Sequence, residues 1–364
     1  MTRRIRATLA LTLFAALAVG VAVASATVVK KHPDWTIEPS DKYAQDHNGT
    51  LQFGVRNLSD ATYKVVKTAN DRKATKLVDG RESGEWLTRE TPFGAAFGPT
   101  GPDSPEIDGQ FLSVRIDYSS EQTTAFTTYT FDKPVPARSL GFTLGDIDVD
   151  QARVSADDAN GDPISGAELQ GEVFNFCEVP DPPTSCEEDT DRSTPIWTPD
   201  ATGGLLFGDA DETEGASGYF RPSVPITRLR VAFEGNPGAG SPSYRTWIGV
   251  RSNPIGGRVT TVGGKGIGGA ELRLVSPSGE VRARTTSNAN GRYEFPGDWS
   301  LSDGWRVRIV PPDDWKVKGS AVENADNTED PGFAPFVLFK PNKPKPKPKP
   351  KPKPKPKKPQ PVTG

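Results

Sequence analysis

Apolar and polar residues alternate along much of the central part of this chain. The stretch 112–118 alternates Leu, Val, Ile and Tyr with Ser, Arg and Asp, and the stretches 226–233 and 244–250 have a similar half-buried pattern. Successive side chains of a β-strand point to opposite faces, so this period of two is typical of strands. No segment between residues 27 and 340 keeps apolar residues at helical spacing for three turns. The pattern therefore predicts an all-β body.

Turn-forming residues separate these alternating stretches. The 364 residues include 37 Gly and 35 Pro, a content typical of turn-rich β-proteins. Sequences such as Asn160-Gly-Asp-Pro and Asn236-Pro-Gly-Ala-Gly end one stretch and begin another. We predict about ten strands between residues 33 and 252, arranged as one large jelly-roll-type β-sandwich over residues 27–252.

The first 26 residues have the organisation of a secretory signal peptide. Arg3, Arg4 and Arg6 precede an uncharged apolar stretch, and Ala24-Ser25-Ala26 provides a cleavage site. The sequence predicts export and a mature chain that begins at Thr27 and keeps no stable transmembrane segment. An uncleaved membrane anchor is the alternative, because the apolar stretch approaches the ~20 residues that span a bilayer. In both cases the body lies outside the cell.

The two cysteines are separated by a short loop that is acidic and rich in proline. Cys177 and Cys186 enclose the sequence EVPDPPTS, and exported proteins keep disulfides in oxidising compartments. The spacing favours a local disulfide over a metal site or a reactive thiol.

Charge divides the chain into an acidic body and a basic tail. Residues 27–339 contain 31 basic and all 47 acidic residues, a net charge of −16, whereas residues 340–364 contain ten lysines and no acid. Alternating Lys and Pro predict a disordered or polyproline II segment of roughly 60 Å at 341–364. This tail is either a solvated spacer or a tether that binds an anionic cell-wall polymer. It lacks arginine and aromatic residues, which argues against specific nucleic-acid binding.

The last five residues resemble the sortase sorting signal of Gram-positive surface proteins. Gln360, Pro361, Val362, Thr363 and Gly364 match the pattern Leu-Pro-x-Thr-Gly except at its first position. The hydrophobic span and basic residues that normally follow this signal are missing. A truncated sequence or a chance match is therefore the alternative to covalent attachment to the wall.

A second, more compact pattern begins after a boundary at Ser252-Asn-Pro-Ile-Gly-Gly257. Three motifs follow in order, namely Gly-x-Val at 257–259, Gly-Ala-x-Leu-x-Leu at 269–274 and Gly-x-Tyr-x-Phe at 291–295, and the Asn290-Gly291 turn is typical of a β-hairpin. These motifs resemble the prealbumin-like β-sandwiches of bacterial surface proteins, including CnaB-type and carboxypeptidase-regulatory domains. The resemblance implies a small Ig-like sandwich over residues 253–340 that acts as a rigid stalk.

The densest group of carboxylates follows Leu140-Gly-Phe-Thr-Leu-Gly145. Strand alternation would place Asp146, Asp148 and Asp150 on one face, where they repel one another unless a cation or a basic partner intervenes. Ca²⁺ takes six to eight oxygen ligands, so these residues are a candidate calcium site. The Gly-Asp-Ile-Asp sequence also resembles jelly-roll domains of exported actinobacterial proteins. A solvated acidic rim is the alternative.

Residues suited to catalysis are scarce. His32 lies close to the mature N-terminus, which leaves His47 as the one histidine for a catalytic or metal site. A Gly-x-Ser-x-Gly motif and a P-loop are both absent from the sequence. Two carboxylates could serve a glycosidase, but 47 acids make any such pair unselective. We therefore predict no catalytic residues, and Trp86 and Trp197 are candidate platforms for sugar stacking.

Together these features favour an exported, non-enzymatic protein of a Gram-positive or actinobacterial cell surface or wall. A jelly-roll head would bind a carbohydrate or an extracellular protein, as an adhesin does, on a stalk held by the basic tail. Two alternatives remain open. One is a secreted glycan-active hydrolase with an accessory β-sandwich module. The other is a structural protein whose acidic bodies and basic tails pair between copies in an envelope layer.

Overall fold

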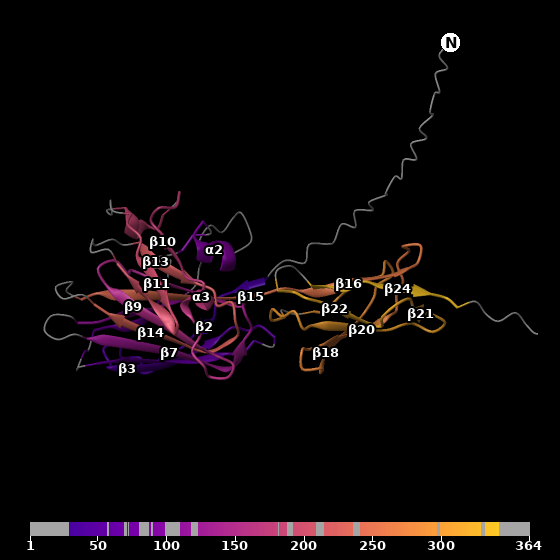
Figure 1. Cartoon of the computed structure of the whole chain (residues 1–364), viewed down its shortest axis with the longest axis horizontal. Helices are drawn as coiled ribbons and strands as arrows, with labels where there is room; N and C mark the ends of the chain where they lie inside the picture. Colours follow the sequence, from indigo (N-terminus) through magenta and orange to yellow (C-terminus); the bar gives the residue numbers. More distant parts are fainter. Residues whose placement is uncertain are drawn as a thin grey trace, which may run out of the picture.

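The computed structural model describes residues 29–341, except for 57, 69–70, 72, 80–86, 89, 99–109, 118–122, 181, 188–191, 209–214, 236–240, 297–298 and 329–331. The predicted signal peptide and the tail from residue 342 onwards lie outside the described residues. As predicted, the described chain is almost entirely β, with the short helices α2 (Pro92–Phe97) and α3 (Gly166–Leu169) and the 3-10 turn η1 (Thr184–Cys186). It forms two sandwiches that lie end to end (Figure 1). None of the described helices has the length and apolar character needed to span a membrane.

The larger sandwich has a seven-stranded and an eight-stranded sheet. The first contains β1 (Val29–Lys31), β5 (Thr75–Asp79), β6 (Gln110–Arg115), β8 (Leu140–Gly145), β10 (Glu172–Asn175), β13 (Ala216–Phe220) and β15 (Ser243–Ser252). The second contains β2 (Asp34–Trp35), β3 (Asp46–Gln52), β4 (Ala61–Lys67), β7 (Thr124–Val135), β9 (Gln151–Asp158), β11 (Ile196–Asp200), β12 (Gly203–Phe207) and β14 (Ile226–Glu234).

The strand order gives this sandwich its jelly-roll character. The seven-stranded sheet runs β10-β13-β8-β15-β6-β5, with β1 beside β15, and the eight-stranded sheet runs β11-β12-β9-β14-β7-β4-β3-β2. From β7 onwards the chain passes repeatedly from one sheet to the other, as in jelly rolls. The described strands outnumber the ten or so predicted from sequence because several of them, such as β2 and β10, are very short.

The inward faces of the two sheets form the main core. The alternation predicted at 112–118 is confirmed as far as residue 116, because Leu112, Val114 and Ile116 are fully buried and Arg115 is exposed. Tyr118 lies outside the described residues. β14 alternates in the same way. β15 departs from its predicted half-buried pattern, since nearly all of its residues are buried. The reason is α2, which packs on the outer side of β15, so that a Cβ at Gly249 would lie 2.9 Å from the side chain of Phe97.

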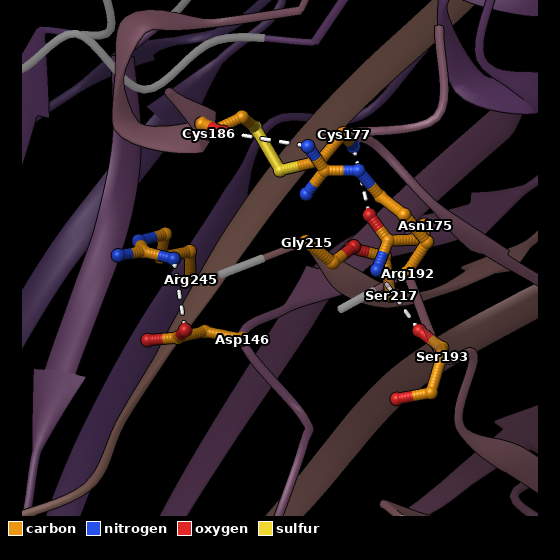
Figure 2. The surroundings of a disulfide bond; sticks show 9 residues. All are labelled: Asp146, Asn175, Cys177, Cys186, Arg192, Ser193, Gly215, Ser217 and Arg245. Atoms are coloured by element: carbon orange, nitrogen blue, oxygen red, sulfur yellow. Dashed lines mark hydrogen bonds and ion pairs between the residues drawn. A yellow bond between two sulfur atoms is a disulfide. The ribbon is translucent and has the colours of Figure 1, made fainter. Parts of the chain in front are cut away.

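A smaller aromatic cluster covers part of the outer face of the seven-stranded sheet. Ile248 belongs to the main core and its neighbour Trp247 to this second cluster, so the two side chains lie on opposite faces of β15. The buried members of the cluster are Leu87, Phe93, Phe97, Phe111, Phe176, Cys177, Cys186, Tyr219 and Trp247. The disulfide between Cys177 and Cys186, predicted from their spacing, is present (Figure 2). It ties the 177–186 loop to this aromatic cover.

The smaller sandwich also has two sheets. One contains β16 (Ile255–Thr261), β19 (Arg292–Glu294), β21 (Lys316–Val317), β23 (Gly332–Phe333) and β24 (Phe336–Phe339). The other contains β17 (Glu271–Val275), β18 (Val281–Thr286), β20 (Arg306–Val310) and β22 (Val322–Asn324). Their inward faces enclose a separate core that includes Trp299 and Trp305. This is the small sandwich that the prealbumin-like motifs predicted.

The hairpin predicted at Asn290-Gly291 is wrong. β18 pairs with β17, whereas β19 pairs with β16 in the other sheet, so the turn links two sheets. The Asn288 carboxamide oxygen closes it by accepting from the backbone N–H groups of Asn290 and Arg292, each at 3.0 Å. Gly291 has a φ of 77°, which glycine adopts at little cost. The turn residues are therefore those expected, but the strands they join have different partners.

A hydrogen-bonded junction connects the two sandwiches. The backbone N–H of Ser300 donates to the carbonyl of Arg56 at 3.2 Å, and the Arg56 guanidinium lies 5.6 Å from the centre of the Trp299 ring. The side chains of Asn253 and Asn327 are fully buried, and each donates to the backbone carbonyl of the other, at 2.7 and 3.0 Å. The contacts of Arg56 with Trp299 and Ser300 hold the head against the second sandwich. The Asn253–Asn327 pair ties the residue that follows β15 to the second sandwich.

Replacing both cysteines by alanine is expected to lower the free energy of unfolding by about 2–3 kcal/mol, because the ten-residue loop from 177 to 186 loses its closure in the unfolded chain. Urea titrations of the wild type with and without reductant, and of the Cys177→Ala/Cys186→Ala protein, measure this change. The reduced wild type should unfold at the same urea concentration as the variant. A midpoint that reductant does not move would contradict the expectation.

Candidate functional site

The outer face of the eight-stranded sheet carries a groove of about 670 Å³. It lies over β2, β3, β4 and β7, where neither described helix packs. The lining residues are Thr36, Glu38, Asn48, Gly49, Thr50, Thr62, Tyr63, Lys64, Val66, Phe126, Thr128 and Thr130. Most of them carry a hydroxyl, an amide or a charge, so the groove is rich in hydrogen-bonding groups.

Strand register arranges these side chains in rows across the sheet. Thr50 pairs with Thr62, and Thr62 with Thr130, which gives one row of threonines. A second row joins Asn48, Lys64 and Thr128. Directly opposed side chains of neighbouring strands lie about 5 Å apart. The groove therefore presents a regular lattice of hydroxyl, amide and ammonium groups.

An exposed aromatic ring lies at one end of this lattice. Phe126 is 45% exposed and pairs with Val66 on one side and Ala232 on the other. Its neighbours Ala125 and Thr127 point into the core. An exposed ring on a polar sheet face is an unusual use of a large apolar side chain, because burial of such a ring is normally favourable. Phe126 can therefore stack on a flat apolar surface such as one face of a sugar ring.

The end of the groove at β2 is built around a buried tyrosine. The Tyr63 hydroxyl donates to the carbonyl of Thr36 at 2.8 Å, and burial raises the pKa of this phenol, which keeps its proton in place. A Cβ at Gly49 would lie 2.3 Å from the Tyr63 ring, so only glycine fits above it. The hydroxyls of Thr36 and Thr50 are 2.9 Å apart. These contacts fix the position of the first threonines.

Beyond β7 the same sheet face becomes strongly charged. Asp157 is buried and accepts two hydrogen bonds from Arg230, at 2.7 and 2.9 Å, while Arg228 approaches it to 3.3 Å. Arg228 is the cross-strand neighbour of Thr130. The paired guanidinium groups thus form the boundary of the groove on β14.

The predicted calcium residues do not share a strand face. β8 ends at Gly145, Asp146 has a φ of 67°, and the segment 146–150 crosses to β9 in the other sheet. Asp146 is ion-paired with Arg245 at 3.1 Å (Figure 2). It also accepts a hydrogen bond from the Ser243 hydroxyl at 3.0 Å. Asp148 and Asp150 are each 4% exposed, which does not fit the alternative of a solvated rim.

A basic partner therefore lies beside the first of these aspartates. In the part of the chain that the structure describes, no group of three or more His, Cys, Asp or Glu side chains is arranged to hold a metal ion. Calcium at this place stays a prediction, and it would require Asp146 to exchange Arg245 for the ion.

His47, which the sequence analysis gave as the one histidine for a catalytic or metal site, lies in the interior of the head. His47 is fully buried, and its Nε2 lies 3.1 Å from the Ala44 carbonyl. Burial lowers its pKa, and the positive charge of Lys67 lowers it further. A neutral histidine without exposed surface does not reach a substrate, so the structure gives His47 a packing role.

The other predicted site residues either lie outside the described residues or pack elsewhere in the head. Trp86 and the sortase-like residues 360–364 lie outside the described residues. Trp197 packs edge-on against Phe220, with ring centres 4.9 Å apart, and so belongs to the periphery of the core. Phe126 was missed at the sequence level, although the alternation of residues 124–131 places it on the same face as Thr128 and Thr130.

Comparison with known proteins gives only distant similarities. No protein-family model matches the sequence, and no curated protein matches it. Among solved structures, the chain is similar to BcpA, the major pilin subunit of Bacillus cereus, with 7% identity, a TM-score of 0.21 and coverage of 64% of this chain and 72% of the pilin. The adhesin domain of Epf from Streptococcus pyogenes gives 12% identity, a TM-score of 0.20 and coverage of 84% and 99%. The Bacillus anthracis TIE protein gives 9% identity, a TM-score of 0.22 and coverage of 84% and 57%.

Replacing the buried Lys67 by methionine is expected to raise stability at neutral pH. Burial lowers the pKa of Lys67 from 10.5 to about 8, only partly opposed by Asp71. Between pH 8 and 10.5 the unfolded chain therefore binds more protons at this residue, so wild-type stability rises with pH in that window. The Lys67→Met protein should lack this rise and gain up to about 3 kcal/mol at pH 7.

Urea unfolding of both proteins from pH 7 to 10.5 tests this expectation. Lys64→Met, which changes an exposed lysine on the same strand, is the control and should keep the wild-type pH dependence. An unchanged slope in Lys67→Met would contradict the role assigned to the buried ammonium group.

Proposed function

We propose that this protein is an exported, surface-associated binding protein whose larger sandwich binds a carbohydrate in the groove of the eight-stranded sheet. The observation that carries the proposal is the combination of an exposed Phe126 with ordered rows of threonine, asparagine and lysine on an uncovered sheet face. Sugars present hydroxyl groups at their edges and C–H groups on their faces. Polar side chains and an aromatic ring are the groups that such a ligand needs.

The composition of the groove supports binding over hydrolysis. Glycosidases generally use two carboxyl groups that flank the scissile bond. Glu38 is the one carboxylate among the described residues that line the groove. A glycan-active hydrolase remains the second candidate, and turnover of a bound glycan would favour it.

Surface association rests on the two ends of the chain. The basic, apolar leader is typical of exported proteins. The Lys-Pro tail provides positive charge at regular spacing, which attracts an anionic wall polymer. The second sandwich, which contacts the head through Ser300 and Arg56, would separate the head from the anchoring tail.

Glycan binding should depend on the exposed ring of the groove. The Phe126→Ala protein is expected to lose about tenfold in affinity for a glycan that the wild type binds, because ring stacking and apolar contact are lost. The measurement is a neutral and acidic polysaccharide panel in affinity electrophoresis, followed by calorimetry. Phe333→Ala is the matched control, since Phe333 is 46% exposed but lies in the second sandwich. Equal affinities of the two variants would remove the groove from the proposal.

Retention at the surface should depend on the charge of the tail. A chain in which the tail lysines are replaced by glutamine keeps the proline spacing and is expected to appear in the medium. The wild type should stay with the cells and be released by high salt, because screening weakens the attraction between exposed charges. Release of the wild type only by a wall-digesting enzyme would instead support sortase attachment. Both chains free in the medium would contradict surface association.

A further inference from the structure

A second cavity, of about 380 Å³, opens on the outer face of the seven-stranded sheet. The two sheets bury their inward faces against each other, so this cavity lies on the opposite side of the sandwich from the carbohydrate groove. Its size is at the lower end of the range for ligand pockets. The lining residues that matter most are Lys42, Tyr43, Lys73, Lys76, Arg115 and Arg245.

The cavity is basic within an acidic domain. Residues 27–252 contain 36 acidic and 21 basic residues, a net charge of −15, yet five basic side chains line this one cavity. Asp146 is paired with Arg245, and Asp117 approaches Lys73 to 3.7 Å. Among the described carboxylates, none is paired with Lys42, Lys76 or Arg115. Three positive charges therefore remain to attract an anion.

Strand register forms the floor of the cavity. Lys76, Ser113 and Arg245 are direct cross-strand partners on β5, β6 and β15. Arg245 is 7% exposed and is held by Asp146 (Figure 2). Arg115 is fixed by a hydrogen bond from its Nε to the carbonyl of Ser241 at 2.9 Å. The guanidinium groups of Arg245 and Arg115 are thus positioned before any ligand arrives, which reduces the entropy lost on binding.

The walls of the cavity are also tied to the sheet. The buried carboxylate of Asp71 accepts from the backbone N–H groups of Lys73 and Asp117, at 2.7 and 2.8 Å. Lys67 donates to the carbonyl of Lys73 from below. The backbone N–H of Thr75 donates to the carbonyl of Lys42 at 2.8 Å. These bonds hold Lys42 and Lys73 beside β5.

An exposed aromatic ring completes the cavity. Tyr43 is 52% exposed, and the ammonium group of Lys42 lies 5.0 Å from the centre of its ring. The backbone N–H of Tyr43 donates to the carboxylate of Asp41 at 3.0 Å, which fixes the start of this segment. Inorganic anions need only the positive charges, whereas a sugar that carries an anionic group can also use the ring.

We infer that this cavity binds an acidic sugar unit, whose carboxylate or phosphate lies between Lys42, Lys76 and Arg115 and whose ring contacts Tyr43. Guanidinium and ammonium groups bind both anions by charge-assisted hydrogen bonds. This second site shares no lining residue with the groove of the eight-stranded sheet. It would let one head bind an acidic unit and a neutral stretch on opposite faces.

Calorimetry with short probes tests the site on the full chain. Digalacturonate and glucose 1-phosphate supply the two anions, and maltose is the neutral probe. Lys76→Gln/Arg115→Gln should weaken binding of the acidic sugar about tenfold or more, since each charge-assisted hydrogen bond is worth about 1.5–3 kcal/mol. Lys316→Gln/Lys318→Gln removes the same charge from the exposed edge strand β21 and the residue after it, and it keeps the basic tail.

Three further results decide the inference. Equal loss in the two double variants, or loss in neither, would overturn it, because binding would then reflect overall charge or the tail. The Tyr43→Ala protein should bind both acidic sugars more weakly and should keep the wild-type affinity for inorganic phosphate. An unchanged affinity for the sugars would overturn the role of the ring. Hexaglutamate that binds as tightly as digalacturonate would show a site for acidic peptide and would also overturn the inference. Loss of glycan binding in Phe126→Ala bears on the groove and leaves this result unaffected.

Discussion

The burial of two sheet faces against each other is the interaction on which the rest of this structure depends. Along β6, β7 and β14 every second side chain is buried. These side chains belong to a core that includes residues from Trp35 to Val250. Removal of apolar surface from water is the main favourable term in folding. Because the inward side chains supply the core, the side chains on the outer faces need not be apolar. Both candidate sites of the head are on those outer faces.

The two outer faces differ in what covers them. On the seven-stranded sheet, α2 and the disulfide-bonded loop bury Trp247 and Tyr219 in an aromatic cluster. The basic cavity lies on the same face, over β5, β6 and the start of β15. On the eight-stranded sheet the threonine rows lie uncovered beside Phe126. A single core thus supports one face with rows of hydroxyl, amide and ammonium groups and another with a cluster of basic side chains.

The second sandwich has its own core and is fixed to the head by polar contacts. The reciprocal bonds of Asn253 and Asn327 are fully buried, and buried amides that lose a partner are costly. These bonds fix the residue that follows β15 to the second sandwich, and Arg56 of the head contacts Trp299 and Ser300, where the two sandwiches meet end to end (Figure 1).

Local pattern and distant contact determined different parts of this protein. The sequence alone determined the all-β class, the inward residues of β6 and β14 and the Cys177–Cys186 bond, because alternation and short loop closure involve neighbouring residues. Alternation over residues 124–131 is also enough to place Phe126 on one face with Thr128 and Thr130, although we did not predict it. Whether that face stays open depends on covering elements from elsewhere in the chain. Only the tertiary structure showed that the strands on either side of the Asn290-Gly291 turn belong to separate sheets. Only it placed Arg245 beside Asp146. The physical reason is that sheet pairing, coverage and charge partners depend on residues far apart in sequence, whose approach the packed core decides.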